Sequence, residues 1–141
     1  MSASPAVSTL DQNKQLTIRW FEEIWNRGNR DVIVQLFASD GVLYDGATLI
    51  RGPAEFERFY DRLRAQFSDI KISPVLVLAE GDLACVHWFA EVKHSTSGKS
   101  AHITGTSIVR IKDGRFVEAW QNWDAAGLAA QLADTPPAPL F

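Results

Sequence analysis

The carboxyl-terminal third of the chain constrains the fold most, because it predicts two strands joined by a tight turn and followed at once by a helix. Residues 103–111 and 115–123 alternate apolar with small or polar side chains, and Lys-Asp-Gly stands between them at 112–114. An Asp-Gly turn between two alternating runs is a strong β-hairpin signal. After residue 123 the period changes, and Leu128 and Leu132 lie four apart on one face of a short amphipathic helix. The segment therefore predicts a hairpin that ends in a helix.

Asp124 stands where the last strand becomes the helix. Aspartate is a preferred helix N-cap, so capping alone is one interpretation. A carboxylate that aromatic rings shield from water also makes a general base, and Trp120 and Trp123 are close in sequence. On a regular strand Trp120, Asn122 and Asp124 share one face of the sheet, whereas Gln121 and Trp123 share the other. In the second interpretation Asp124 is the base, and the Asn122 amide binds a substrate oxygen beside it.

Hydrophobic periodicity predicts three helices in the first half of the chain and a meander of strands after them. The helices are expected at residues 10–26, 31–37 and 53–67, with a turn at 39–41, and further strands at 42–50, 71–79 and 83–94. This order indicates the α+β class, with a curved, cone-shaped antiparallel sheet packed against three helices. Such a cone leaves an apolar space between sheet and helices, where we expect a small apolar molecule to bind.

Length and charge limit the remaining possibilities. The chain has 141 residues, which predicts a single domain over residues 10–133, with a flexible start at 1–9 and a proline-rich tail at 134–141. A formal net charge of −3 argues against a nucleic-acid partner held by phosphate contacts. No stretch resembles a secretion signal or a membrane span, and the single cysteine leaves no internal disulfide. We therefore expect a cytoplasmic protein with no membrane partner.

The three histidines are further candidates for acid–base chemistry. His87 lies in the middle of a predicted strand, and His102, on the next strand, is the favoured partner of Asp124. His94 stands beside a turn rich in serine and glycine and is expected to be solvated. The histidines lack the spacing of metal ligands, and no glycine-rich nucleotide motif occurs. We expect neither a metal nor a cofactor.

Two segments carry a resemblance to a known family. Residues 36–63, LFASDGVLYDGATLIRGPAEFERFYDRL, resemble the nuclear transport factor 2-like superfamily, and residues 113–132, DGRFVEAWQNWDAAGLAAQL, resemble its SnoaL-like polyketide cyclases. The resemblance covers roughly residues 17–132. It implies a cone of strongly bent sheet closed by three helices, and a homodimer. The superfamily includes ketosteroid isomerases, cyclases, epoxide hydrolases, dehydratases and modules with no chemistry, so the resemblance leaves the reaction open.

The resemblance also implies roles for individual residues. Asp45 lies where ketosteroid isomerases keep the carboxylate that moves a proton between carbons, which makes it a second candidate base. The tyrosine and aspartate with which those enzymes polarise the substrate carbonyl correspond to Phe21 and to a position near Ser107. Because neither donor is repeated, steroid isomerisation is not expected. Asp124 matches the aspartate that SnoaL-like cyclases keep at the end of the last strand.

Two functions from different classes are compatible with these residues. The first is a cofactor-independent cyclase, isomerase or dehydratase that acts on an apolar carbonyl compound, with Asp124 or Asp45 as base and His102 as a polar partner. The residues expected to contact its substrate are Trp120, Asn122, His87, Tyr44, Phe21 and Tyr60. The second is a non-catalytic module for small-ligand binding or dimerisation. In either case we expect a homodimer through the outer face of the sheet, because a broad apolar face is seldom left in water.

Overall fold

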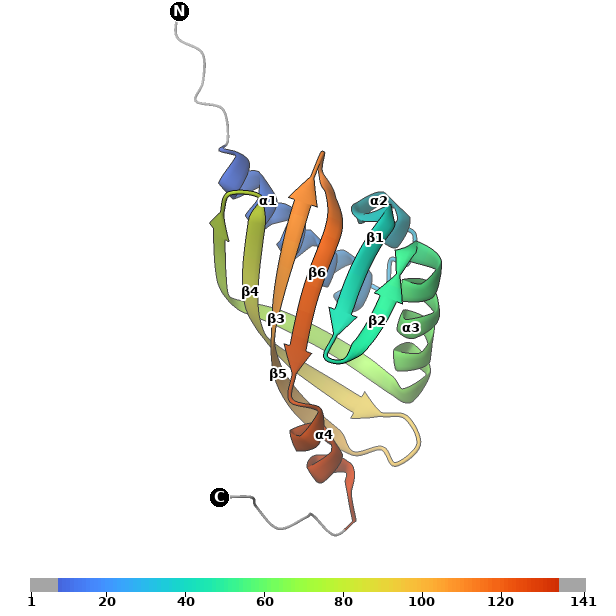
Figure 1. Ribbon diagram of the computed structural model, residues 1–141. Helices are drawn as coiled ribbons and strands as arrows, with labels where there is room; N and C mark the ends of the chain where they lie inside the picture. Colours follow the sequence, from blue (N-terminus) through green and yellow to red (C-terminus); the bar gives the residue numbers. More distant parts are fainter. Residues whose placement is uncertain (1–7, 135–141) are drawn as a thin grey trace, which may run out of the picture.

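The computed structural model describes residues 8–134 and shows a curved sheet of six strands with helices packed against it (Figure 1). The strand order is β2-β1-β6-β5-β4-β3, and neighbouring strands are antiparallel except β1 and β6, which run parallel. The predicted α+β cone, with three helices in the first half of the chain and a short helix at the end, is confirmed. Residues 1–7 of the predicted flexible start and 135–141 of the predicted tail lie outside the described residues.

The elements have the following bounds. The helices are α1 (Thr9–Arg19), continued without a break by the π-helix η1 (Trp20–Asn26), then α2 (Val32–Leu36), α3 (Gly52–Gln66) and α4 (Ala125–Leu132). The strands are β1 (Phe37–Asp45), β2 (Thr48–Arg51), β3 (Phe67–Glu80), β4 (Leu83–His94), β5 (Ser100–Lys112) and β6 (Arg115–Trp123). None of the helices in the described part of the chain is both long enough and apolar enough to cross a membrane.

The hairpin of β5 and β6 has the predicted turn. Lys112 pairs with Arg115, and Asp113 and Gly114 between them have φ angles of 52° and 74°. Two successive positive φ values are typical of a type I′ turn, whose twist matches that of the strands. At the other end of β6, the Asp124 Oδ1 accepts a hydrogen bond from the Gly127 backbone N–H at 2.9 Å. Asp124 is therefore the N-cap of α4, as the capping interpretation predicts.

The turn predicted at residues 39–41 is wrong. These residues belong to β1, which starts at Phe37, directly after α2. The pairing of β1 with β6 is irregular, because it passes from Phe37 opposite Phe116 to Val42 opposite Glu118. Between these two pairs β1 advances by five residues and β6 by two. The polar residues at 39–41, which signal a turn in the sequence, therefore lie in a bulge of the strand.

The helices are held on the sheet by an aromatic core and by bonds to the end of η1. The Trp20 ring lies 4.9 Å from that of Phe56 on α3 and 5.3 Å from that of Phe116 on β6. The Tyr60 hydroxyl donates to the Ile24 carbonyl at 2.8 Å, and the Arg64 guanidinium donates to the same carbonyl. Both donors satisfy the Ile24 carbonyl near the end of η1, which would otherwise lack a partner. η1 is consequently fixed between α3 and the sheet.

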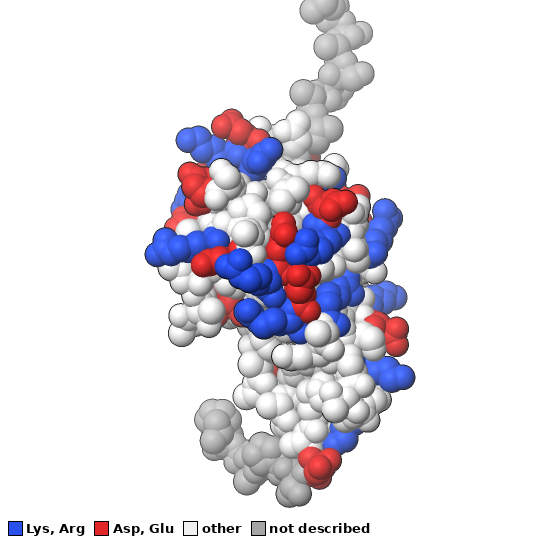
Figure 2. Space-filling model, turned by 90° about the vertical axis from the view of Figure 1, so that its right-hand side faces the viewer, with Lys and Arg blue, Asp and Glu red and all other residues white. Residues whose placement is uncertain are grey.

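The outer face of α3 is covered by charges of both signs (Figure 2). Arg30, which precedes α2, forms ion pairs with Glu57 and Asp61 of α3 at 3.0 and 2.9 Å. Its hydrogen bond holds the pKa of the Asp61 carboxyl below the ordinary value. Toward the lower end of this view, where α4 lies, uncharged side chains predominate. The mixed charges indicate a solvated helix face.

Candidate functional site

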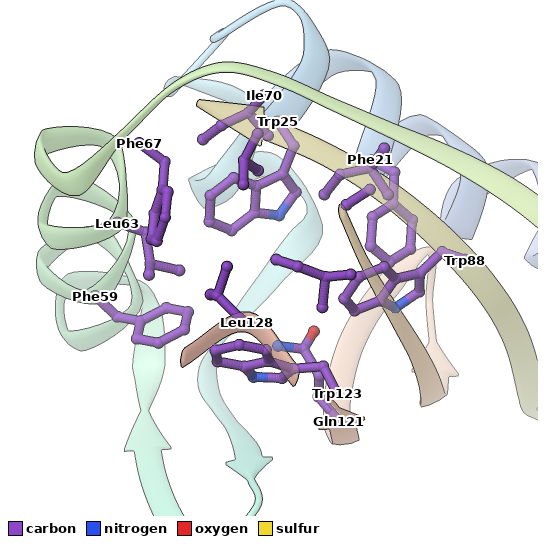
Figure 3. Close-up of a pocket in the computed structure, with 14 residues that line it drawn as sticks. Phe21, Trp25, Phe59, Leu63, Phe67, Ile70, Trp88, Gln121, Trp123 and Leu128 are labelled. Atoms are coloured by element: carbon purple, nitrogen blue, oxygen red, sulfur yellow. The ribbon is translucent and has the colours of Figure 1, made fainter. Parts of the chain in front are cut away.

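An apolar cavity of about 80 Å³ lies inside the cone (Figure 3). Phe59 and Leu63 of α3 line one side, Phe21 and Trp88 line the other, and Leu128 of α4 lies between them. The full wall consists of Phe21, Trp25, Phe59, Leu63, Phe67, Ile70, Ile72, Trp88, Ala90, Val92, Ile103, Gln121, Trp123 and Leu128. Apart from the indole N–H groups, Gln121 is the one polar side chain among these residues. The cavity therefore suits an apolar ligand with few hydrogen-bonding groups.

A row of hydrogen bonds runs along the wall of this cavity. The Trp88 Nε1–H donates to the Ser107 hydroxyl at 3.1 Å, and that hydroxyl donates to Gln121 Oε1 at 3.3 Å. The Gln121 Nε2 then donates to Asp45 Oδ1 at 3.2 Å, and the Trp123 Nε1–H donates to the same oxygen at 3.0 Å. Because Ser107 occupies the amide oxygen, the Gln121 NH₂ group is directed to Asp45. In the described part of the chain, Asp45 is the only side-chain carboxylate hydrogen-bonded to the wall.

The parallel pairing of β1 and β6 places Asp45 beside this wall. Asp45 is the last residue of β1 and lies in register with Gln121, which is 76 residues away in sequence. Both side chains point to the inner face of the sheet, and Asp45 itself is half-buried. Its Oδ1 is held by two donors, whereas Oδ2 has no hydrogen-bond partner among residues 8–134. A carboxylate with one anchored and one available oxygen is suited to proton transfer.

Five predicted site residues lie on the opposite, outer face of the sheet. Tyr44 stacks on Trp120 at a ring distance of 6.2 Å, His87 Nδ1 is 3.1 Å from the Thr106 hydroxyl, and the His102 ring packs on Phe89 at 5.8 Å. Asn122, the fifth, is exposed in register with Thr106. The predicted division of β6 into two faces is correct, but Gln121 and Trp123, not Trp120 and Asn122, face the cavity. The geometry thus does not support substrate contacts for Tyr44, His87, His102, Trp120 and Asn122.

Asp124 also lies outside the cavity wall. Its side chain is exposed and occupied with the Gly127 N–H, and no hydrogen bond joins it to His102 in the described structure. The His102 backbone instead exchanges two hydrogen bonds with the Gln131 side chain, at 2.9 and 2.8 Å, which docks α4 on β5. A catalytic role for Asp124 with His102 therefore stays a prediction that this geometry does not support.

Of the two ligand contacts predicted on helices, one lines the cavity. Phe21 of η1 lines the cavity. Tyr60 is buried but does not line it, and its hydroxyl donates a hydrogen bond to the Ile24 carbonyl. Sequence reasoning did not propose Gln121 or Leu128 as site residues. The sequence does contain features that point to both residues: Gln121 shares a strand face with Trp123, and Leu128 is on the apolar face of the last helix. Among residues 8–134, no group of three or more His, Cys, Asp and Glu side chains is placed to hold a metal ion.

The comparisons with known proteins concern the family and the fold. A sequence model of the family described as SnoaL-like domain matches residues 17–119. No curated protein sequence matches the chain.

Solved structures share the fold over nearly the whole chain. A candidate SnoaL-like polyketide cyclase from Jannaschia sp. CCS1 superposes with a TM-score of 0.84 at 18% identity, covering 95% of this chain and 100% of its own. IdmH, a candidate polyketide cyclase from Streptomyces antibioticus, has a TM-score of 0.78 at 23% identity over 86% of this chain and 98% of its own. AclR, a candidate hydroxylase from Streptomyces galilaeus, has a TM-score of 0.82 at 19% identity over 94% and 91%. At such identities the likeness concerns the fold alone.

Proposed function

Because the chain belongs to the SnoaL-like domain family, we propose that it is a cofactor-independent acid–base enzyme that acts on a small apolar carbonyl compound bound in the cone cavity. The observation that carries this proposal is the attachment of one carboxylate, Asp45, to the wall of an otherwise apolar cavity through Gln121 and Trp123. An apolar enclosure favours a neutral carbonyl substrate, and a carboxylate hydrogen-bonded to its wall supplies the base. The reaction class is isomerisation, cyclisation or dehydration.

In this proposal Asp45 Oδ2 takes a proton from the carbon next to the substrate carbonyl. The electron pair of the broken C–H bond then forms an enolate, whose oxygen accepts a hydrogen bond from the second N–H of Gln121 Nε2. In an isomerisation, Asp45 returns the proton to another carbon. In an aldol cyclisation, the enolate attacks a second carbonyl of the same molecule, and the proton neutralises the new alkoxide. The cavity holds the reacting groups together, which lowers the entropic part of the barrier.

The test of this proposal is hydrogen exchange at the substrate carbon in D₂O. We expect the protein to speed deuterium incorporation into at least one small apolar ketone, such as a phenyl or cyclic ketone, measured by mass spectrometry. Leu128→Trp should slow this exchange at least tenfold, because the larger side chain would fill the cavity that Leu128 lines. Leu132→Trp is the matched control, since Leu132 is on the same helix but not in the wall. Equal rates in the two variants, or exchange with no ketone, would contradict the proposal.

The second candidate is a non-catalytic module that binds a small apolar ligand. The observation in its favour is that none of the three predicted catalytic residues, Asp45, Asp124 and His102, lines the cavity, and that only Asp45 is hydrogen-bonded to its wall. This function predicts that apolar ketones bind to the protein with no acceleration of exchange. Calorimetric titration alongside the exchange measurement separates the two functions.

We also propose that the protein forms a homodimer through an apolar row on the outer face of the sheet. The row consists of Leu49, Tyr44, Trp120, Ile108, Cys85 and Leu78, which lie in register across all six strands. Leu78 is 65% exposed and Ile108 38%. A two-fold axis that lies in the interface, parallel to the strands and across the middle of this row, would place its two ends on one another, which is the geometry of an isologous interface.

Leu78→Asp should convert the dimer into a monomer at micromolar concentration. Each interface would then bury two unpaired carboxylates, whereas the monomer loses little because Leu78 is largely exposed. Val34→Asp is the control, since Val34 is 49% exposed on α2, away from the row. Sedimentation velocity measures both variants and the parent protein. A monomeric parent, or a Leu78→Asp variant that stays dimeric, would refute the interface.

A further inference from the structure

A second, smaller cavity lies deeper in the cone. It has a volume of about 30 Å³ and is lined by Thr17, Trp20, Phe21, Phe37, Leu43, Ser107, Val109, Phe116, Ala119 and Gln121. Only Phe21 and Gln121 line both this cavity and the larger one. The two residues therefore form the partition between an outer and an inner chamber of the same cone.

The two halves of the partition are held differently. Gln121 is fixed by hydrogen bonds at both ends of its amide, to Ser107 and to Asp45. Phe21 is held by packing alone: its side chain is 3% exposed, and its ring centroid lies 6.2 Å from that of Trp88 (Figure 3). Shortening Phe21 would thus open a passage beside Gln121 and leave the row of hydrogen bonds in place.

We propose that Phe21 is the residue that limits how long a ligand the cone accepts. The proposal rests on the function proposed above, in that it takes the outer chamber as the ligand site. Apart from Thr17, Ser107 and Gln121, the wall of the inner chamber is apolar, and the Thr17 hydroxyl is already donated to the Asn13 carbonyl at 2.8 Å. An alkyl end of a ligand therefore fits the inner chamber, while the ring or carbonyl stays in the outer one beside Gln121. With Phe21 present, the protein selects short compounds.

The test uses phenyl ketones with n-alkyl chains of increasing length, from acetophenone to heptanophenone, titrated by calorimetry. In the parent protein the affinity should stop rising after the first few members. In Phe21→Ala it should continue to rise by about fourfold for each further methylene that becomes buried, and so gain at least tenfold over the longer members. Phe59→Ala is the matched control, because Phe59 lines the outer chamber only. It should keep the length profile of the parent.

A second substitution places the gain in the inner chamber. Ala119→Val in the Phe21→Ala background should remove the added affinity for long ketones, because Ala119 lines the inner chamber and not the outer one. Should Phe21→Ala fail to fold, Phe21→Leu tests the same partition with a smaller cavity. If the affinity of the parent protein already rises through the whole series, or if the Phe21 variant shows the same dependence on chain length as the parent, only the role of Phe21 is overturned and the ligand site stands. No binding of any ketone by the parent or the variants overturns the ligand site itself, and with it the proposed function.

Discussion

Replacing Asp45 with asparagine should reduce the rate of ketone α-hydrogen exchange about a thousandfold, within the range that a positioned general base contributes. The amide keeps the shape of the carboxylate, and its oxygen still accepts the hydrogen bonds of Gln121 and Trp123. The free energy of unfolding should therefore change by less than about 1 kcal/mol. What the variant loses is the negative charge and the available oxygen that takes the proton. Exchange rates by mass spectrometry and urea unfolding curves measure the two effects separately.

Asp124→Asn is the matched control for this experiment. Asparagine is as good an N-cap as aspartate, so its oxygen should still accept from the Gly127 N–H and hold α4. Since Asp124 neither lines the cavity nor is hydrogen-bonded to a side chain of its wall, the exchange rate should stay within about twofold of the parent protein. The opposite outcome, a loss in Asp124→Asn with an active Asp45→Asn, would assign the base to the end of β6.

Gly105→Ala should destabilise the protein by about 3 kcal/mol, the upper end of the range for overpacked cores. Gly105 lies opposite Trp88 on the neighbouring strand, and a Cβ at this position would meet the Trp88 Cζ2 at 2.2 Å. No real Cβ approaches an atom so closely, and Trp88 cannot swing into solvent because it is only 5% exposed and its indole is bonded to Ser107. Either the indole or β5 must shift. Urea denaturation measures the loss.

A double-mutant cycle tests the cause of this loss. Trp88→Phe removes the part of the ring that meets the added methyl group, so Gly105→Ala should cost at least about 1 kcal/mol less in that background. The two costs would be equal if the alanine acted through strand backbone alone. A Gly105→Ala variant as stable as the parent would show that the sheet yields at this point and that the approach of Trp88 is not a constraint.

Local patterns of the sequence were sufficient for most of the fold. The Asp-Gly turn of the last hairpin, the helix cap at Asp124 and the two faces of β6 all follow from interactions between residues close in the chain. The turn predicted at 39–41 failed because polar residues and glycine also occur in strand bulges. The order of the elements indicates an α+β fold with a curved sheet, and the resemblance of residues 36–63 and 113–132 to a known family added the strong bend of that sheet and its closure by three helices.

Patterns among residues close in the sequence did not determine which residues form the site. Sequence periodicity determined that Gln121 and Trp123 share one face of β6 and Trp120 and Asn122 the other, but both faces carry a tryptophan and an amide, so neither is marked as the inner one. The packing of η1 and α3 on the sheet decided that question, since it buries Trp88 and Ser107 on the side of Gln121. The parallel pairing of β1 with β6 then placed Asp45 beside Gln121 across 76 residues of chain. Contacts at such separation depend on how the whole sheet is assembled, so only the tertiary structure could place the base, the amide and the two chambers in one cone.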